Sequence, residues 1–303
     1  MSNPQSAPDT AHILQRFQQI AQQIPYQDLG EIAGVQLGIK RLDCIHPQIS
    51  GNKFFKLKYN LVAARAQGYR QLLTFGGAYS NHIAATAYAA QLFGFDSIGI
   101  IRGEELAERP RNATLHHAEQ LGMSLNFVSR ENYRQKQQPS YMAQLQRHYP
   151  DAYILPEGGS NLLAVQGCEE ILSAQDRENY DVICCAVGTG STLAGLIRAS
   201  DTRQQVLGFS ALKGCFQADS IQQYTRAQHW RLTDDYCGGG YAKSSTELRA
   251  FMQDFEARYQ IPLEQVYTAK MCYGVIDLIQ QGYFPTASRI LLLHTGGLQG
   301  RNI

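Results

Sequence analysis

Short apolar runs alternate with helical patterns along most of this 303-residue chain, and glycines stand at many of the joints between them. We expect strands at residues 35–40, 71–75, 97–101, 124–128, 182–187, 205–210 and 289–293. We expect helices from residue 52 to Gly68 and at residues 83–93, 112–121, 191–199 and 270–281, with a surface helix and connection at 129–150. This alternation predicts an α/β fold of open, twisted parallel sheets with helices on both faces. Uniformly apolar runs of this kind are typical of buried parallel strands.

The bulk properties narrow the classes of protein. A chain of this length with 44% hydrophobic residues can bury a large core and form one or two domains. A net charge of +1 without a long basic block gives no electrostatic reason to expect nucleic acid or an anionic membrane as partner. No apolar stretch approaches membrane-spanning length, and the polar start at residues 1–10 is unlike a signal peptide. We therefore expect a cytoplasmic protein.

The seven cysteines are an odd number and lack the spacing of a metal site. Cys184 and Cys185 fall in an expected strand, where neighbouring side chains point to opposite faces, so they cannot grip one zinc ion together. We expect reduced thiols and no metal.

Lys53 follows Ser-Gly-Asn at the start of an expected helix, with Asn52 as N-cap and Gly68 as the stop. In the first helical turn, free backbone N–H groups attract anions such as phosphate. Lys53 is therefore a candidate Schiff-base lysine beside an anionic cofactor, although this segment alone fits a solvated lysine equally simply. We expect Lys56 and Lys58 to be solvated.

Three glycine-containing turns follow expected strands, where ligands of open α/β sheets collect. Residues 74–82 offer hydroxyl, amide and imidazole groups, and residues 294–297 close the last strong strand. Residues 186–192 offer successive N–H donors and hydroxyls, as a phosphate cradle without a P-loop lysine. Each turn alone also fits a tight connection. A nicotinamide site is disfavoured, because the third glycine of that fingerprint is missing.

Taken in order, these segments resemble the motifs of one family. They are Gly51-Asn52-Lys53, Ser80-Asn81-His82, Pro156-Glu157-Gly158-Gly159-Ser160-Asn161, Gly188-Thr189-Gly190-Ser191-Thr192, Val266-Tyr267-Thr268-Ala269-Lys270 and His294-Thr295-Gly296-Gly297. The chain thereby resembles the D-cysteine desulfhydrase and 1-aminocyclopropane-1-carboxylate (ACC) deaminase family, enzymes that depend on pyridoxal 5'-phosphate (PLP). An ordered set of this kind is far more specific than any one motif.

The resemblance implies the fold type II of PLP enzymes, which is like tryptophan synthase β. It implies a discontinuous large domain of residues 1–55 and 161–303 and a small domain of residues 56–160, with Lys53 near the junction. It also implies PLP as cofactor, a small amino acid as substrate and a homodimer as the assembly.

The resemblance also implies roles for single residues. Lys53 holds PLP and moves protons at the substrate α-carbon, while Asn81 binds the phenolic oxygen and Thr295 the pyridine nitrogen. The phosphate goes to the turn formed by Gly188, Thr189, Gly190, Ser191 and Thr192.

On the substrate side, the resemblance assigns catalysis or substrate binding to Ser80 and Tyr267, with N–H donors from Asn81 and His82. Ser80 can also cap the following helix, and Tyr267 can also be a core aromatic. We expect His294 to be a buried core histidine.

The family includes more than one activity, and departures from its pattern bear on the choice. ACC deaminases carry a second active-site tyrosine, which we match to Leu292, two residues before His294. Leucine cannot take part in ring opening, so D-cysteine desulfhydrase-like β-elimination to pyruvate, ammonia and sulfide is the expected reaction. ACC deamination and D-serine-type dehydration stay as alternatives. Because the pair Phe54 and Phe55 is unusual for the family, a binding protein that holds PLP with little turnover is a further alternative.

Overall fold

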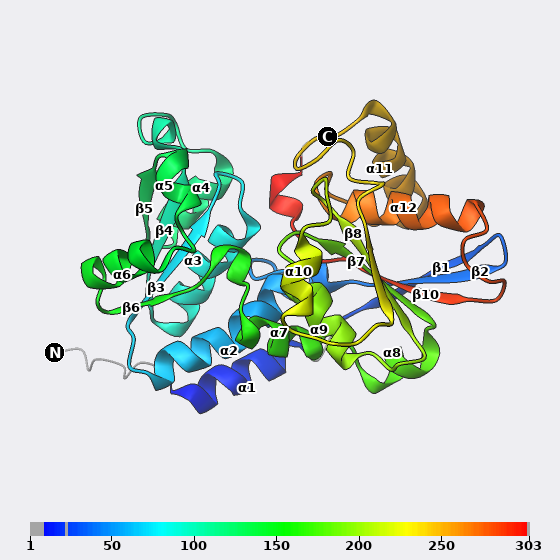
Figure 1. The fold of residues 1–303 in the computed structure, drawn as a ribbon, viewed down its shortest axis with the longest axis horizontal. Helices are drawn as coiled ribbons and strands as arrows, with labels where there is room; N and C mark the ends of the chain where they lie inside the picture. The colour runs from blue at the N-terminus through cyan, green and yellow to red at the C-terminus, as the bar shows by residue number, and fades with distance from the viewer. Residues whose placement is uncertain (1–8, 22–23, 302–303) are drawn as a thin grey trace.

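The computed structural model describes residues 9–21 and 24–301, so the polar start discussed above lies mostly outside the described residues. The chain forms two α/β lobes, each built around its own sheet, with helices α1, α2 and α7 running along their base (Figure 1). The neighbouring strands and their pairing confirm the predicted α/β fold with parallel sheets.

The larger sheet has six strands in the order β1-β2-β10-β7-β8-β9. Their bounds are β1 Tyr26–Ile32, β2 Val35–Lys40, β7 Val182–Val187, β8 Gln205–Ser210, β9 Trp230–Thr233 and β10 Arg289–Leu293. All neighbours are parallel except β1, which forms an antiparallel hairpin with β2 at the sheet edge. The sequence prediction missed β1, whose polar residues and Gly30 disguise the strand.

The smaller sheet has four parallel strands in the order β5-β4-β3-β6. They are β3 Gln71–Gly76, β4 Asp96–Arg102, β5 Met123–Val128 and β6 Ala152–Ile154. All four fall inside the predicted small domain of residues 56–160. The exact domain boundaries stay a prediction.

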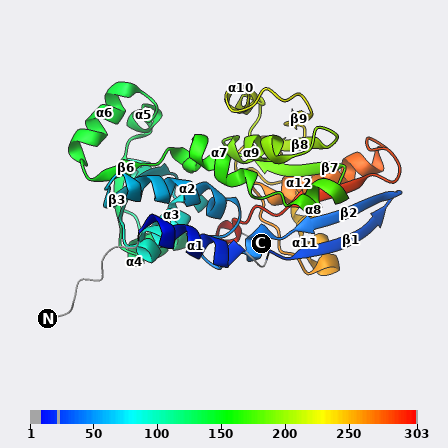
Figure 2. The same ribbon diagram turned by 90° about the horizontal axis from the view of Figure 1, so that it is seen from below.

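Helices cover both faces of each sheet (Figures 1 and 2). They are α1 Thr10–Ala21, α2 Asn52–Ala66, α3 Asn81–Phe93, α4 Ala113–Gln120, α5 Arg130–Arg134, α6 Pro139–His148, α7 Leu162–Glu169, α8 Ala174–Asn179, α9 Ser191–Ala199, α10 Gln217–Gln222, α11 Thr246–Tyr259 and α12 Thr268–Gln280. Short 3₁₀ turns lie at Leu42–Cys44, Glu104–Leu106, Glu157–Gly159 and Leu298–Gly300.

Strand β7 illustrates how the core of the large lobe is divided. Cys184 packs into the cluster beneath α11 and α12, while Cys185 packs into the cluster with α7 and α9. The two thiols therefore lie on opposite faces of the sheet, as predicted. Within the described part of the chain, no group of three or more acidic, histidine or cysteine side chains is placed to hold a metal ion.

Two sequence predictions about α2 are wrong. The N-cap is Gly51 and not Asn52, which is the first residue of the helix. Lys56 and Lys58 are not solvated, since only 2% and 5% of their surfaces are exposed. The Lys58 amine pairs with Glu170 at 2.6 Å. Burial of a lysine is tolerated when polar groups receive its amine, and both lysines meet that condition.

No helix in the described ranges is long and apolar enough to cross a membrane.

Candidate active site

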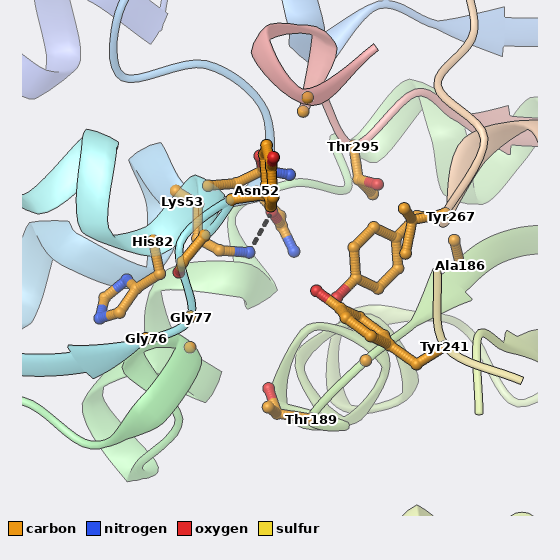
Figure 3. A pocket seen from close by; sticks show the side chains of 18 of the residues that line it. Asn52, Lys53, Gly76, Gly77, His82, Ala186, Thr189, Tyr241, Tyr267 and Thr295 are labelled. Carbon is orange, nitrogen blue, oxygen red and sulfur yellow. Dashed lines mark hydrogen bonds between the residues drawn. The ribbon is translucent and has the colours of Figure 1, made fainter. Parts of the chain in front are cut away.

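A cavity of about 550 Å³ lies where residues of the two sheets meet (Figure 3). Its wall is formed at the carboxyl ends of strands β3, β4, β7 and β10, the edge where parallel sheets collect ligands. The predicted site residues that line it are Lys53, Ser80, Asn81, His82, Gly188, Thr189, Gly190, Thr192, Tyr267 and Thr295. Ser191 is the one predicted site residue that does not line the cavity, because its side chain is buried behind the wall. The structure thus brings together segments that are far apart in the sequence.

Gly51 fixes the entry of Lys53 into the cavity. Its φ is +67°, and an added Cβ would lie 1.9 Å from the carbonyl oxygen of Thr295. Only glycine permits this approach, which allows the Asn52 N–H to donate to that same oxygen at 3.3 Å. The start of α2 is thereby joined to the turn after β10.

Asn52 orients the lysine. Its amide nitrogen donates to the hydroxyl of Thr192 at 2.9 Å, and its amide oxygen accepts from the Lys53 amine at 3.0 Å (Figure 3). The Lys53 pKa is lowered to about 7, first by burial and second by the charge of Lys56. The amine can therefore lose its proton near neutral pH, as a nucleophile or base must.

Lys56 also lines the cavity, although the sequence analysis expected its side chain to be solvated. Its amine donates to the Gly158 carbonyl at 3.0 Å and to the hydroxyls of Ser160 and Thr189 at 3.4 and 3.3 Å. The signal was available, because a lysine three residues after Lys53 shares its face of the helix. The turn at residues 188–192 thus has a lysine after all, supplied by another element.

The turn between β7 and α9 presents the features of a phosphate site. Helix α9 begins at Ser191 without a side-chain cap, since Gly190 with φ +93° occupies the N-cap position. Ser160 contacts the hydroxyls of Thr189 and Ser191 from the facing loop. Free helical N–H groups, hydroxyls and the Lys56 charge together suit a dianion.

The turn after β3 opens helix α3. Ser80 caps it by accepting from the Ile83 N–H at 3.3 Å, which leaves the Ser80 hydroxyl proton free to donate. Asn81 accepts from Gln299 at 2.5 Å. Gly297 has a φ of +93°, a left-handed conformation that favours glycine there as well.

His82 is held in one neutral form. The Thr74 hydroxyl donates to the Leu155 carbonyl at 3.1 Å, so it must accept from the His82 Nε2–H at 2.8 Å. Burial, together with the charges of Lys53 and Lys56, lowers the His82 pKa well below its ordinary value. The imidazole is therefore neutral.

Tyr267 is positioned from both sides. Its ring packs on Gly188, where an added Cβ would lie 3.1 Å from the ring. Its backbone N–H donates to the buried Glu264 carboxylate at 2.7 Å. Burial and the neighbouring Tyr241 raise the Tyr267 pKa well above its ordinary value, so the phenol stays protonated.

Tyr241 is a second cavity tyrosine that the sequence analysis missed. Its ring meets that of Tyr267 edge-on at 6.2 Å between centroids (Figure 3). It follows three successive glycines, and the loop is fixed by the buried Lys270 amine, which donates to the carbonyls of Cys237 and Gly240 at 2.6 and 2.9 Å.

Comparison with known proteins decides the family. The chain matches the family described as "Pyridoxal-phosphate dependent enzyme" over residues 18–296. The protein is a member of that family. A Thermotoga maritima protein named "Putative 1-aminocyclopropane-1-carboxylate deaminase" is 30% identical, with 90% of this chain and 92% of that protein covered. A Serratia proteamaculans "D-cysteine desulfhydrase" is 27% identical, with 89% of this chain and 88% of that protein covered.

A solved structure agrees with this assignment. The crystal structure of an ACC deaminase homologue superimposes with a TM-score of 0.80 at 26% identity and covers 97% of this chain and 96% of that one. The fold is therefore the type II fold of PLP enzymes, and PLP is the cofactor of this PLP-dependent enzyme.

The residues of the cavity fit that cofactor. The Lys56 amine faces the turn at residues 188–192 through its bond to Thr189 and has no carboxylate partner among the described residues, so a dianionic phosphate held there would supply a counter-charge. The glycines at 188 and 190 let Tyr267 and Ile221 pack closely on the turn that leads into α9, and the N–H groups at the start of that helix have no side-chain cap.

The structure bears on two substitutions that the sequence analysis singled out. Leu292 is fully buried in the core beneath α11 and α12 and is not among the residues that line the cavity; its match to a tyrosine of ACC deaminases stays a prediction. Phe54 and Phe55 are core residues, and the ring centroids of Phe54 and Phe17 lie 4.7 Å apart. Neither phenylalanine lines the cavity.

His294 is confirmed as a core histidine. It is fully buried, its Nε2–H donates to the Pro262 carbonyl at 2.7 Å, and its Nδ1 accepts from the Gly296 N–H at 3.3 Å. The residue supports the last turn from behind.

Proposed function

We propose that this enzyme is a deaminating lyase that performs β-elimination on a small amino acid, with D-cysteine as the leading substrate and pyruvate, ammonia and sulfide as products. The observation that carries this proposal is the Lys53 amine, whose pKa is lowered to about 7 in a cavity shared with Ser80 and a protonated Tyr267.

Bound PLP withdraws electrons from the substrate α-carbon and so makes its proton easier to remove. In the proposal, Lys53 carries the cofactor, Asn81 and Thr295 hold the ring oxygen and nitrogen, and the turn at residues 188–192 takes the phosphate together with Lys56.

The remaining steps belong to side chains of this protein. The backbone N–H groups of Asn81 and His82 and the Ser80 hydroxyl bind the substrate carboxylate. Lys53 then takes the α-proton as a general base. The Cβ–S bond breaks, its electron pair leaves on sulfur, and Tyr267 donates a hydrogen bond to that sulfur. The aminoacrylate product hydrolyses in water to pyruvate and ammonia.

ACC deamination is the second candidate, and a specific observation favours it. Tyr241 lines the cavity beside Tyr267, and several relatives bear that activity in their names. The raised pKa of Tyr267 speaks for the elimination, because a protonated phenol donates hydrogen bonds and is a poor nucleophile. Dehydration of D-serine requires the same groups as desulfhydration.

The test is release of product by the PLP-loaded enzyme from D-cysteine, D-serine and ACC, measured as sulfide, keto acid and ammonia. The proposal expects pyruvate and sulfide from D-cysteine at the highest kcat/KM. Release of 2-oxobutyrate from ACC as the dominant activity would replace it with the second candidate. No keto acid above the Lys53→Ala background from any of the three would contradict both, and would leave a protein that binds PLP with little turnover.

A further inference from the structure

Arg102 is an exposed arginine in the cavity wall without a carboxylate partner. It ends strand β4, next to the β3 turn that carries Ser80. Its guanidinium lies against Gly77, where an added Cβ would be 3.5 Å from the nearest nitrogen. Among the described residues, no carboxylate lies within ion-pair distance of it, whereas eight of the other eighteen arginines have one: Arg41, Arg70, Arg111, Arg130, Arg198, Arg203, Arg289 and Arg301.

The carboxylates of the cavity are already satisfied. Glu157 accepts from the Tyr133 hydroxyl at 2.6 Å and pairs with Lys136 at 3.2 Å. Glu264 accepts from three backbone N–H groups at 2.7 Å. Within the described ranges, no carboxylate is therefore committed to Arg102, and the guanidinium remains available to a ligand.

Tyr133 holds the arginine in place. The guanidinium carbon lies 5.8 Å from the centre of the Tyr133 ring, which is itself anchored by Glu157. Stacking on a fixed ring limits the freedom of the side chain and leaves its N–H donors free. Arg102 is thus a positioned donor.

The other anionic groups have separate places. The proposed function gives the cofactor phosphate to Lys56 and the α9 N-terminus, and the substrate α-carboxylate to the α3 N-terminus. Arg102 and the 65% exposed Tyr79 stand farther out, at the mouth of the cavity. A substrate held by its α-carboxylate near Ser80 can extend its side chain toward that mouth.

We infer that Arg102 is a specificity-determining residue that selects amino acids with an anionic β-substituent, such as a phosphate ester or sulfonate, over those with a neutral one. This inference rests on the proposed β-elimination. The reaction needs no added reagent besides water, because the α-proton passes to Lys53 and the electron pair of the Cβ–X bond leaves with X as phosphate or sulfite. Pyruvate and ammonia are the other products.

The experiment compares initial rates of pyruvate release from O-phosphoserine and cysteate with that from β-chloroalanine, whose side chain is neutral, in both enantiomeric forms. The PLP-loaded enzymes are wild type, Arg102→Met, Arg102→Lys and, as matched control, Arg109→Met. Arg109 is an exposed arginine of the same lobe that does not line the cavity. Calorimetric Kd values for O-phosphoserine and serine give a second measurement that does not depend on turnover.

Arg102→Met is expected to lose about tenfold in kcat/KM for the anionic substrates and about tenfold in affinity for O-phosphoserine, the scale of one charge-assisted hydrogen bond. The values for β-chloroalanine and serine should stay within about twofold, Arg102→Lys should fall between, and the Arg109→Met variant should match wild type.

Two outcomes overturn the inference. An equal loss for charged and neutral compounds assigns Arg102 to the common α-carboxylate, and no loss makes it a surface residue. If no pyruvate forms from any compound, the proposed lyase activity fails, and the calorimetric ratio of O-phosphoserine to serine alone decides whether Arg102 selects the anion.

Discussion

The two walls of the cavity differ in how firmly the fold fixes them. Following the proposed function, we define the cofactor wall as Lys53, Lys56, residues 188–192 and Thr295. We define the substrate wall as Tyr79, Ser80, Arg102, Tyr241 and Tyr267. On the cofactor wall, buried chains approach so closely that glycine is required, as at Gly51. On the substrate wall, Tyr79 and Tyr241 are 65% and 47% exposed. The cofactor wall is set by backbone geometry, whereas side chains on separate loops set the substrate wall.

This difference explains why one PLP site can serve several reactions. The relatives bear names of deaminases and desulfhydrases although they share one family. On the proposed function, we expect changes on the substrate wall to alter which amino acid fits without disturbing PLP binding. The following predictions test that separation, from the largest expected effect to the smallest.

Replacing Lys53 by alanine removes both the cofactor anchor and the proposed base. Keto acid release should fall by at least about a thousandfold, within the range for loss of general base catalysis. Stopped assays with D-cysteine measure it. Lys213→Ala, a change at an exposed lysine outside the cavity, is the control and should keep wild-type rates. A Lys53→Ala enzyme that retains a tenth of the activity would contradict the assignment.

Replacing Lys56 by methionine removes the charge facing the phosphate turn. The affinity for PLP should fall by about 10–100-fold, as expected for lost hydrogen bonds to a charged group, while the KM for substrate measured at saturating PLP should change little. Fluorescence titration of the apoprotein measures the affinity. An unchanged Kd for PLP together with a raised KM for substrate would assign Lys56 to the substrate wall and contradict the separation of the two walls.

The pH dependence of PLP capture reports the Lys53 amine directly. A pKa lowered to about 7 means that the amine is neutral above that pH and protonated below it. Because only the neutral amine attacks the PLP aldehyde, the rate constant for capture should rise about tenfold per pH unit below pH 7 and level off above it. Stopped-flow absorbance measures the rate constant. A rise that continues to pH 10 would show an ordinary lysine pKa.

Lys270→Met should loosen the loop that carries Tyr241, because two carbonyls lose their donor. We expect KM for D-cysteine to rise by about threefold to tenfold with the PLP affinity unchanged, since the loop belongs to the substrate wall. Lys243→Met, in the same loop but exposed, is the matched control. If Lys270→Met instead weakens PLP binding, the two walls are coupled through this loop.

Much of the fold was predictable from the sequence. Buried strands such as β7 and β8 and helix α9 have sharp apolar patterns, with glycines between β7 and α9, and their predicted bounds match the structure. The polar strand β1 and the short strands β6 and β9 carry no such pattern, because edge strands bury little side-chain surface.

The site divides in the same way. Motif order predicted the residues assigned to the cofactor, and nearly all of them line one cavity; their role in binding it stays a prediction. Lys56 was misread as solvated, since its partners come from residues more than a hundred positions away. Tyr241 and Arg102 belong to the substrate wall, where only the tertiary structure brings them to the cavity. The burial of Leu292 away from the cavity also depends on the tertiary structure and cannot be seen in a motif.

The central claim is that Lys53 is the lysine that carries PLP. It is tested most directly by reducing the PLP-loaded enzyme with borohydride, digesting it and locating the pyridoxyl group by mass spectrometry. The account predicts one modified residue per chain, at Lys53, and none in the Lys53→Ala variant. A pyridoxyl group on Lys56, or the same stoichiometry in the variant, would contradict it.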